Sequence, residues 1–149
     1  MRMQSFSPML SAMAVSASFL CASPALADMM KMKATLDGAQ QNPPITTEGK
    51  GTAALVFDTA TKQLTWNVTY SGLSGPATAG HIHGPAAKGE DAGVAVPFKG
   101  APKSPFKGAA VLTDAQAADL MAGKYYINIH TAAHEDGEIR GQIEKAAAM

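Results

Sequence analysis

The chain has 149 residues, with twelve basic and twelve acidic side chains, four histidines and one cysteine. The length suits one domain around a single hydrophobic core. The net charge of zero argues against nucleic acid or an anionic membrane as partner, because both require a basic surface.

The first 27 residues have the features of a cleaved secretory signal peptide. Arg2 supplies a short positive region, residues 9–21 are apolar, and Ala25 and Ala27 form the Ala-x-Ala pattern that signal peptidase cuts. The apolar run is too short for a membrane anchor, and the residues before Cys21 are not the small ones of a lipoprotein site. We therefore expect cleavage after Ala27 and a periplasmic or extracellular protein.

Cleavage leaves residues 28–149, which we expect to form a single domain with its core at about 32–144. The mature chain contains no cysteine, so no disulfide can form in the oxidising compartment. Its stability must come from packing, or from packing and a bound metal.

Short apolar runs alternate with turn residues along the mature chain, which predicts an all-β sandwich or barrel of about eight strands. The clearest run is LTWNVTY, whose apolar and polar side chains alternate as in a strand with one buried face. The predicted strands are 31–36, 51–58, 64–70, 79–83, 93–98, 108–113, 124–130 and 137–144.

A short helix is predicted near 114–122. Thr113 and Gln116 have the spacing of a capping box, and Gly123 provides a stop. A helix of this length is not stable alone, so we expect it to pack across one end of the sandwich.

Two further features have alternative interpretations. The sequence Pro-Phe-Lys-Gly occurs twice within residues 97–108, either as a plain connector between strands or as a basic flap over a site. The methionines at the start of the mature chain, Met29, Met30 and Met32, could offer sulfur ligands to Cu(I). Packing of Met32 into the first strand, with a frayed end before it, is the ordinary alternative.

All four histidines lie in two short segments. In a strand His81 and His83 share one face and Ile82 takes the other, so the two imidazoles should lie outside the sheet. The same alternation points Ile127 and Ile129 inward and Tyr126, Asn128 and His130 outward.

In the last predicted strand, Ile139 and Ile143 should point inward and Glu138, Arg140, Gln142 and Glu144 outward. If these strands are neighbours, His81, His83, His130 and Arg140 gather on one outer patch. His134 lies in the connection and could fold over the patch or point to solvent.

Such a patch has two interpretations. Three or four imidazoles suit copper, zinc or nickel, and nearby carboxylates could fix the ring tautomers. These carboxylates are Glu90, Asp91, Glu135 and Asp136. Alternatively, the histidines tie strand ends and loop carbonyls together. Hydrolysis has little support, because the mature chain has no cysteine nucleophile, G-x-S-x-G turn or paired carboxylates.

The segments HIHGPA and YYINIHTAAHEDGEIRGQI resemble the CHRD family, named after chordin, whose members include stand-alone secreted bacterial proteins. The resemblance runs from about Met32 to Glu144. It implies a binding module, with an unidentified protein or small ligand as partner.

The CHRD family has itself been likened to copper/zinc superoxide dismutase, an immunoglobulin-like Greek-key barrel. By that likeness His81 and His83 would be copper ligands, His130 a third, and Arg140 would attract a small anion, with Asn128 and Glu138 beside them. The dismutase's zinc loop has no counterpart between Gly84 and Val94, and its disulfide cannot form.

The resemblance thus leaves three functions open. The first is a non-enzymatic secreted module that binds copper or another transition metal. The second is a copper-only, dismutase-like redox enzyme. The third is a structural histidine cluster on a protein-interaction domain.

Overall fold

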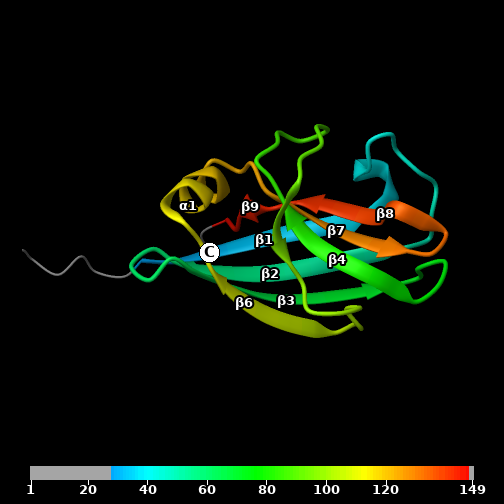
Figure 1. Cartoon of the computed structure of the whole chain (residues 1–149), viewed down its shortest axis with the longest axis horizontal. Coiled ribbons are helices and arrows are strands. Elements are labelled where there is room, and N and C mark those ends of the chain that lie inside the picture. Colours follow the sequence, from blue (N-terminus) through cyan, green and yellow to red (C-terminus); the bar gives the residue numbers. More distant parts are fainter. Residues whose placement is uncertain (1–27, 148–149) are drawn as a thin grey trace, which may run out of the picture.

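A computed structural model describes residues 28–147, which form one curved antiparallel sheet with a short helix (Figure 1). The predicted signal peptide lies outside the described residues. The elements are β1 (Met29–Asp37), the 3-10 turn η1 (Gly38–Gln40), β2 (Lys50–Asp58), β3 (Gln63–Ser71), β4 (Ala77–His83), β5 (Val94–Pro97), β6 (Phe106–Val111), α1 (Asp114–Met121), β7 (Tyr126–Thr131), β8 (His134–Gln142) and β9 (Glu144–Lys145).

The strands follow the order β5-β4-β7-β8-β1-β2-β3-β6, and the short β9 pairs with β1. All pairings are antiparallel. The sheet curls into a nearly closed barrel whose seam lies between β5 and β6, the two ends of this order (Figure 1). The prediction of an all-β barrel with eight main strands and one helix is confirmed.

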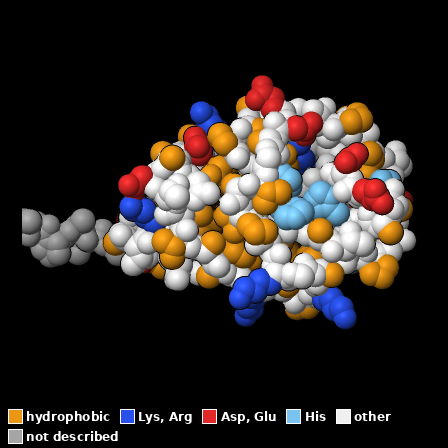
Figure 2. Space-filling model, in the orientation of Figure 1, with side chains coloured by type: hydrophobic (Ala, Val, Ile, Leu, Met, Phe, Trp, Pro, Cys, Tyr) orange, Lys and Arg blue, Asp and Glu red, His pale blue; other side chains and the backbone are white. Residues whose placement is uncertain are grey.

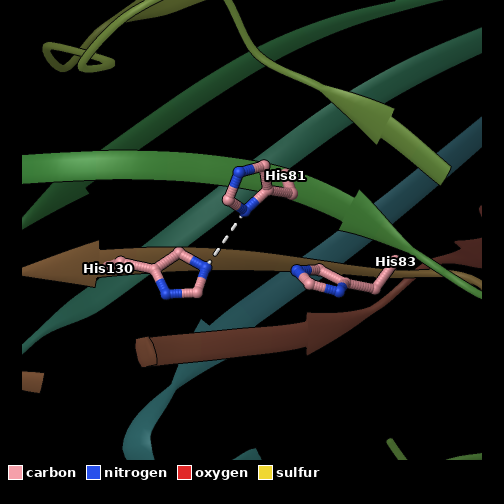
Figure 3. A group of neighbouring side chains, drawn as sticks. All are labelled: His81, His83 and His130. Atoms are coloured by element: carbon pink, nitrogen blue, oxygen red, sulfur yellow. Dashed lines mark hydrogen bonds between the residues drawn. The ribbon is translucent and has the colours of Figure 1, made fainter. Parts of the chain in front are cut away.

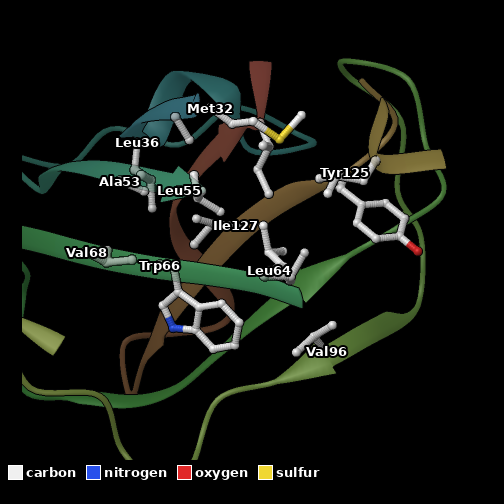
Figure 4. Close-up of a cluster of buried hydrophobic side chains, with 14 of the residues drawn as sticks. Met32, Leu36, Ala53, Leu55, Leu64, Trp66, Val68, Val96, Tyr125 and Ile127 are labelled. Atoms are coloured by element: carbon white, nitrogen blue, oxygen red, sulfur yellow. The ribbon is translucent and has the colours of Figure 1, made fainter. Parts of the chain in front are cut away.

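The core follows the predicted alternation. Leu64, Trp66 and Val68 of β3 are buried, and the polar residues between them lie on the outer face. Ile82 of β4 and Ile127 of β7 are fully buried in the same core, part of which is drawn in Figure 4. Each such side chain contributes about 1.5–3 kcal/mol to folding by leaving water.

Helix α1 begins and ends where its sequence signals predict. The Thr113 side chain accepts from the Gln116 N–H and the Gln116 side chain accepts from the Thr113 N–H, which completes the capping box. Gly123 has φ +73°, a conformation that favours glycine and ends the helix. Leu120 anchors the helix in the barrel core.

The last hairpin is tighter than predicted. The sequence predicted a connection over residues 131–136 before a strand at 137, but β8 already begins at His134, which pairs with Thr131. Gly137 permits this early start, because a Cβ there would lie 2.2 Å from the Asn128 side chain. His134 therefore belongs to a strand rather than to a loop.

The outer face of β8 is not exposed, contrary to the prediction. The side chains of Glu138, Arg140 and Gln142 point away from Ile139 but are only 0%, 2% and 7% exposed. Side chains or carbonyls of the segments before β2 and between β4 and β5 bond to all three. Alternation predicted the correct face of the sheet, but it carries no information about the loops that cover that face.

Candidate metal centre

Three histidines from two paired strands form the centre. His81 and His83 lie on β4 on either side of the buried Ile82, and His130 lies on the neighbouring strand β7. In the strand register His81 is opposite Asn128, which places it diagonally beside His130. One ring nitrogen from each histidine lies within 4.8 Å of the others (Figure 3).

Two of the rings have their tautomers set by the backbone. Nδ1 of His83 lies 2.9 Å from the Ala92 carbonyl oxygen, and Nδ1 of His130 lies 2.8 Å from the Glu135 carbonyl oxygen. A carbonyl can only accept a hydrogen bond, so each Nδ1 carries the hydrogen. In the neutral rings Nε2 is therefore the unprotonated nitrogen, as metal binding requires.

The ring nitrogens that are not bonded to the backbone converge on one point. Nε2 of His130 lies 3.2 Å from Nδ1 of His81, so these two atoms share a single hydrogen or face each other as two acceptors. Nε2 of His83 is buried and has no hydrogen-bond partner among the described residues. Figure 3 shows the ring nitrogen of His83 farther from the backbone turned toward the other two rings. A buried polar atom without a partner is costly, and a cation at this point would satisfy it.

The electrostatics favour the neutral form of His81 and His83. Burial lowers the pKa of His81, and the neighbouring His130 and His83 rings lower it further. Burial also lowers the pKa of His83, although the hydrogen bond to the Ala92 carbonyl opposes the shift. Neutral imidazoles have their lone pairs free, so a metal ion displaces fewer protons on binding.

Tyr126 supports His83 from the neighbouring strand. The two rings are stacked with centroids 5.0 Å apart and an interplanar angle of 4°. The Tyr126 hydroxyl contacts both the N–H and the carbonyl of Ala92, the residue that orients His83. Alternation had placed Tyr126 on the histidine face, but nothing in the sequence indicated that it holds a histidine in place.

Arg140 binds the segment between β4 and β5 and holds it against the sheet. Its guanidinium lies 3.5 Å from the Tyr126 ring centroid, pairs with Asp91 at 2.8 Å and donates to the Glu90 carbonyl. Asn42 donates to the second carboxylate oxygen of Asp91. Arg140 is buried and its charge is matched, which does not fit the expectation of an exposed arginine that attracts a small anion.

The remaining candidates lie outside the trio. Asn128 accepts from Gln41 and donates to the Asp136 carbonyl, so it links β7 to the start of β8 and to the segment before β2. His134 is not part of the group of converging nitrogens. Two backbone carbonyls orient the rings, that of Ala92 in the segment between β4 and β5 and that of Glu135 in β8, rather than the predicted carboxylates.

Glu138 holds two loops on the sheet. Its carboxylate accepts hydrogen bonds from the hydroxyls of Thr47, Thr131 and Ser74 and from the Ser74 N–H, at 2.6–2.8 Å. Burial acts to raise its pKa, but these four bonds outweigh burial and lower the pKa to about 2. Glu138 is thus a buried anion held by neutral donors, and its role is structural.

The comparison with known families decides the identity of the domain. The family model of the CHRD domain matches residues 32–143. The chain belongs to the CHRD domain family. The match covers every strand of the barrel except the start of β1 and the short β9, and it includes all three converging histidines. No curated protein and no solved structure gave a significant match to this CHRD domain. The likeness to the dismutase stays a prediction.

Among the described residues no helix is long and apolar enough to cross a membrane.

Proposed function

We propose that this protein is a secreted CHRD-domain binding module that holds one transition-metal ion, copper or zinc, through His81, His83 and His130. The observation that carries the proposal is the convergence of three ring nitrogens within 4.8 Å, one of them buried without a hydrogen-bond partner in the described part of the chain. Three imidazoles with a free fourth position suit both ions, and copper(II) is favoured in affinity over zinc.

The module is proposed as non-enzymatic. Arg140, the one residue assigned to drawing in a small anion, is bound to Asp91 and Glu90 and is buried. A superoxide-decay assay of the copper-loaded protein tests this part. We expect a rate no higher than that of the same concentration of free copper, and a faster rate would establish the redox enzyme instead.

Calorimetric titration with Cu(II) and Zn(II) tests the site itself. We expect one saturable site in the wild type and an affinity lowered at least about 100-fold in His83→Gln, because a ligand is lost. His134→Gln is the matched control, since it removes a histidine outside the trio, and its affinity should equal that of the wild type. Equal binding by His83→Gln, or a loss in His134→Gln, would contradict the assignment.

The change in stability on adding metal distinguishes a metal site from a purely structural histidine cluster. Within residues 28–147 Nε2 of His83 has no hydrogen-bond partner, so a structural role assigns that atom no function. We expect the wild type to gain stability on adding metal, because the ion binds the folded chain. A histidine cluster that is only structural would show no such gain.

Secretion is proposed from residues 1–27. N-terminal sequencing of the protein recovered from the periplasm or medium should begin at Asp28. A chain that keeps its first residues and stays in the cytoplasm would refute this part alone.

A further inference from the structure

A cavity opens at the seam of the barrel, where β5 and β6 end the strand order without pairing with each other. Its volume is about 620 Å³, within the range of small-molecule sites. None of the three converging histidines lines it. The cavity is therefore a separate feature from the candidate metal centre.

The walls of this seam cavity are aromatic. Trp66 reaches it from β3, Phe98 from the position directly after β5, and Phe106 from the first position of β6. The Phe98 ring centroid lies 5.2 Å from that of Trp66 and 5.1 Å from that of Phe106. Gly108 leaves room for the indole, because a Cβ there would lie 2.4 Å from the Trp66 ring.

The segment that forms the outer wall is fixed in place. The Phe98 N–H donates to the Gly80 carbonyl at 3.1 Å, and the Tyr70 hydroxyl donates to the Pro102 carbonyl. The Tyr70 N–H donates to the Ser104 hydroxyl at 2.8 Å. Three anchors over this short segment mean that the cavity is preformed, so a ligand would not have to order it.

The rim of the cavity is basic. Lys99, Lys103 and Lys107 line it and are exposed, and no carboxylate is among the lining residues. None of the three forms a salt bridge within residues 28–147. On the face shown in Figure 2, hydrophobic side chains gather near the centre, and basic side chains stand along the lower margin.

The repeated Pro-Phe-Lys-Gly sequence builds this arrangement. Each copy supplies one phenylalanine to the wall and the next residue, a lysine, to the rim: Phe98 with Lys99, and Phe106 with Lys107. The repeat is therefore more than a connector, because its two copies place an apolar surface and a positive charge side by side.

From these walls and this rim we propose that the seam cavity binds a small amphipathic carboxylate, with its acyl or aryl body against Trp66, Phe98 and Phe106 and its anionic head at the lysine rim. The aromatic walls provide the apolar contact, and the unpaired lysines provide the complementary charge. The inference is independent of the metal, since no histidine of the trio takes part.

Trp66 is the single tryptophan of the chain and reports on the cavity directly. The wild type, in low salt with a chelator to exclude metal, is titrated with decanoate and with decanol, its uncharged analogue. We expect a saturable change in Trp66 emission with decanoate and about tenfold weaker binding of decanol, because exposed ion pairs add modestly to affinity.

Two matched triple variants locate the anionic head. Replacing Lys99, Lys103 and Lys107 by glutamine should weaken decanoate binding about tenfold and leave decanol unchanged. Replacing Lys31, Lys88 and Lys124, exposed lysines that do not line the cavity, by glutamine should change the binding of neither decanoate nor decanol.

Three results would overturn the proposal. They are a response that does not saturate, equal losses in both triple variants, and a concentration-dependent dimer that buries Trp66 and excludes decanoate. His83→Gln should bind decanoate as the wild type does. The metal proposal and the seam-cavity proposal can therefore fail independently of each other.

Discussion

Replacing Glu138 by glutamine should remove about 3 kcal/mol of the acid sensitivity of the fold. The folded-state pKa of about 2 lies below the ordinary value of 4.5. At about 1.4 kcal/mol per pKa unit, this difference stabilises the charged form by about 3 kcal/mol. The contribution is fully present above about pH 5 and is lost as the pH falls toward about 2, because the unfolded chain takes up the proton first.

Glutamine is the suitable replacement because it can keep all four hydrogen bonds. The Ser74 N–H and the Thr47 hydroxyl both bond to Oε1, which the amide oxygen can replace. The partners of Oε2 are the hydroxyls of Ser74 and Thr131, which can accept from an amide N–H as readily as they donate. The substitution therefore removes the charge and its titration, and no charged side chain is among these partners to complicate the result.

Urea unfolding followed by Trp66 fluorescence, at several pH values from about 7 down to about 2, measures the effect. The free energy of unfolding of the wild type should fall by about 3 kcal/mol more than that of Glu138→Gln over this range. Parallel losses in the two proteins would refute the reasoning, since the acid sensitivity would then arise at other groups.

Three further predictions concern the supports of the two sites. Tyr126→Leu removes the ring stacked on His83 and the hydroxyl that contacts Ala92. Metal affinity measured by calorimetry should therefore fall about tenfold. An unchanged affinity would show that His83 needs no support from Tyr126. Gly108→Ala should lower the free energy of unfolding in urea by about 1–3 kcal/mol, because its Cβ would meet the Trp66 ring, and Gly75→Ala, with open space around its Cβ, should not. Asp91→Ala leaves the buried Arg140 without its carboxylate partner. The free energy of unfolding in urea should fall by about 1–2 kcal/mol, a limited loss because Asp91 itself is half exposed. No loss would mean that Arg140 needs only the Glu90 carbonyl.

Strand periodicity predicted correctly which face of a strand each side chain occupies, because successive side chains point to opposite faces. Ile82 inward and His81 and His83 outward follow from alternation alone, and His130 joins them because β7 pairs with β4. The helix caps were equally local, because Thr113 and Gln116 interact within one turn.

The sequence could not predict how distant loops pack over the outer face of the sheet. Arg140 and Glu138 were expected at the surface, since nothing near them in the chain reveals that Asp91 and Thr47 cover them from 49 and 91 residues away. The partners that orient His83 and His130 are backbone carbonyls, which every residue carries, so no side-chain pattern could indicate them.

Long-range proton–nitrogen NMR of the histidine rings tests the central claim most directly, because it reads which ring nitrogen carries the hydrogen. In the metal-free protein, the neutral rings of His83 and His130 should carry the hydrogen on Nδ1 and leave Nε2 unprotonated. One equivalent of Zn(II) should then shift the rings of His81, His83 and His130 together and leave His134 unchanged. A hydrogen on Nε2 of His83, or rings that do not respond to one equivalent, would contradict the account.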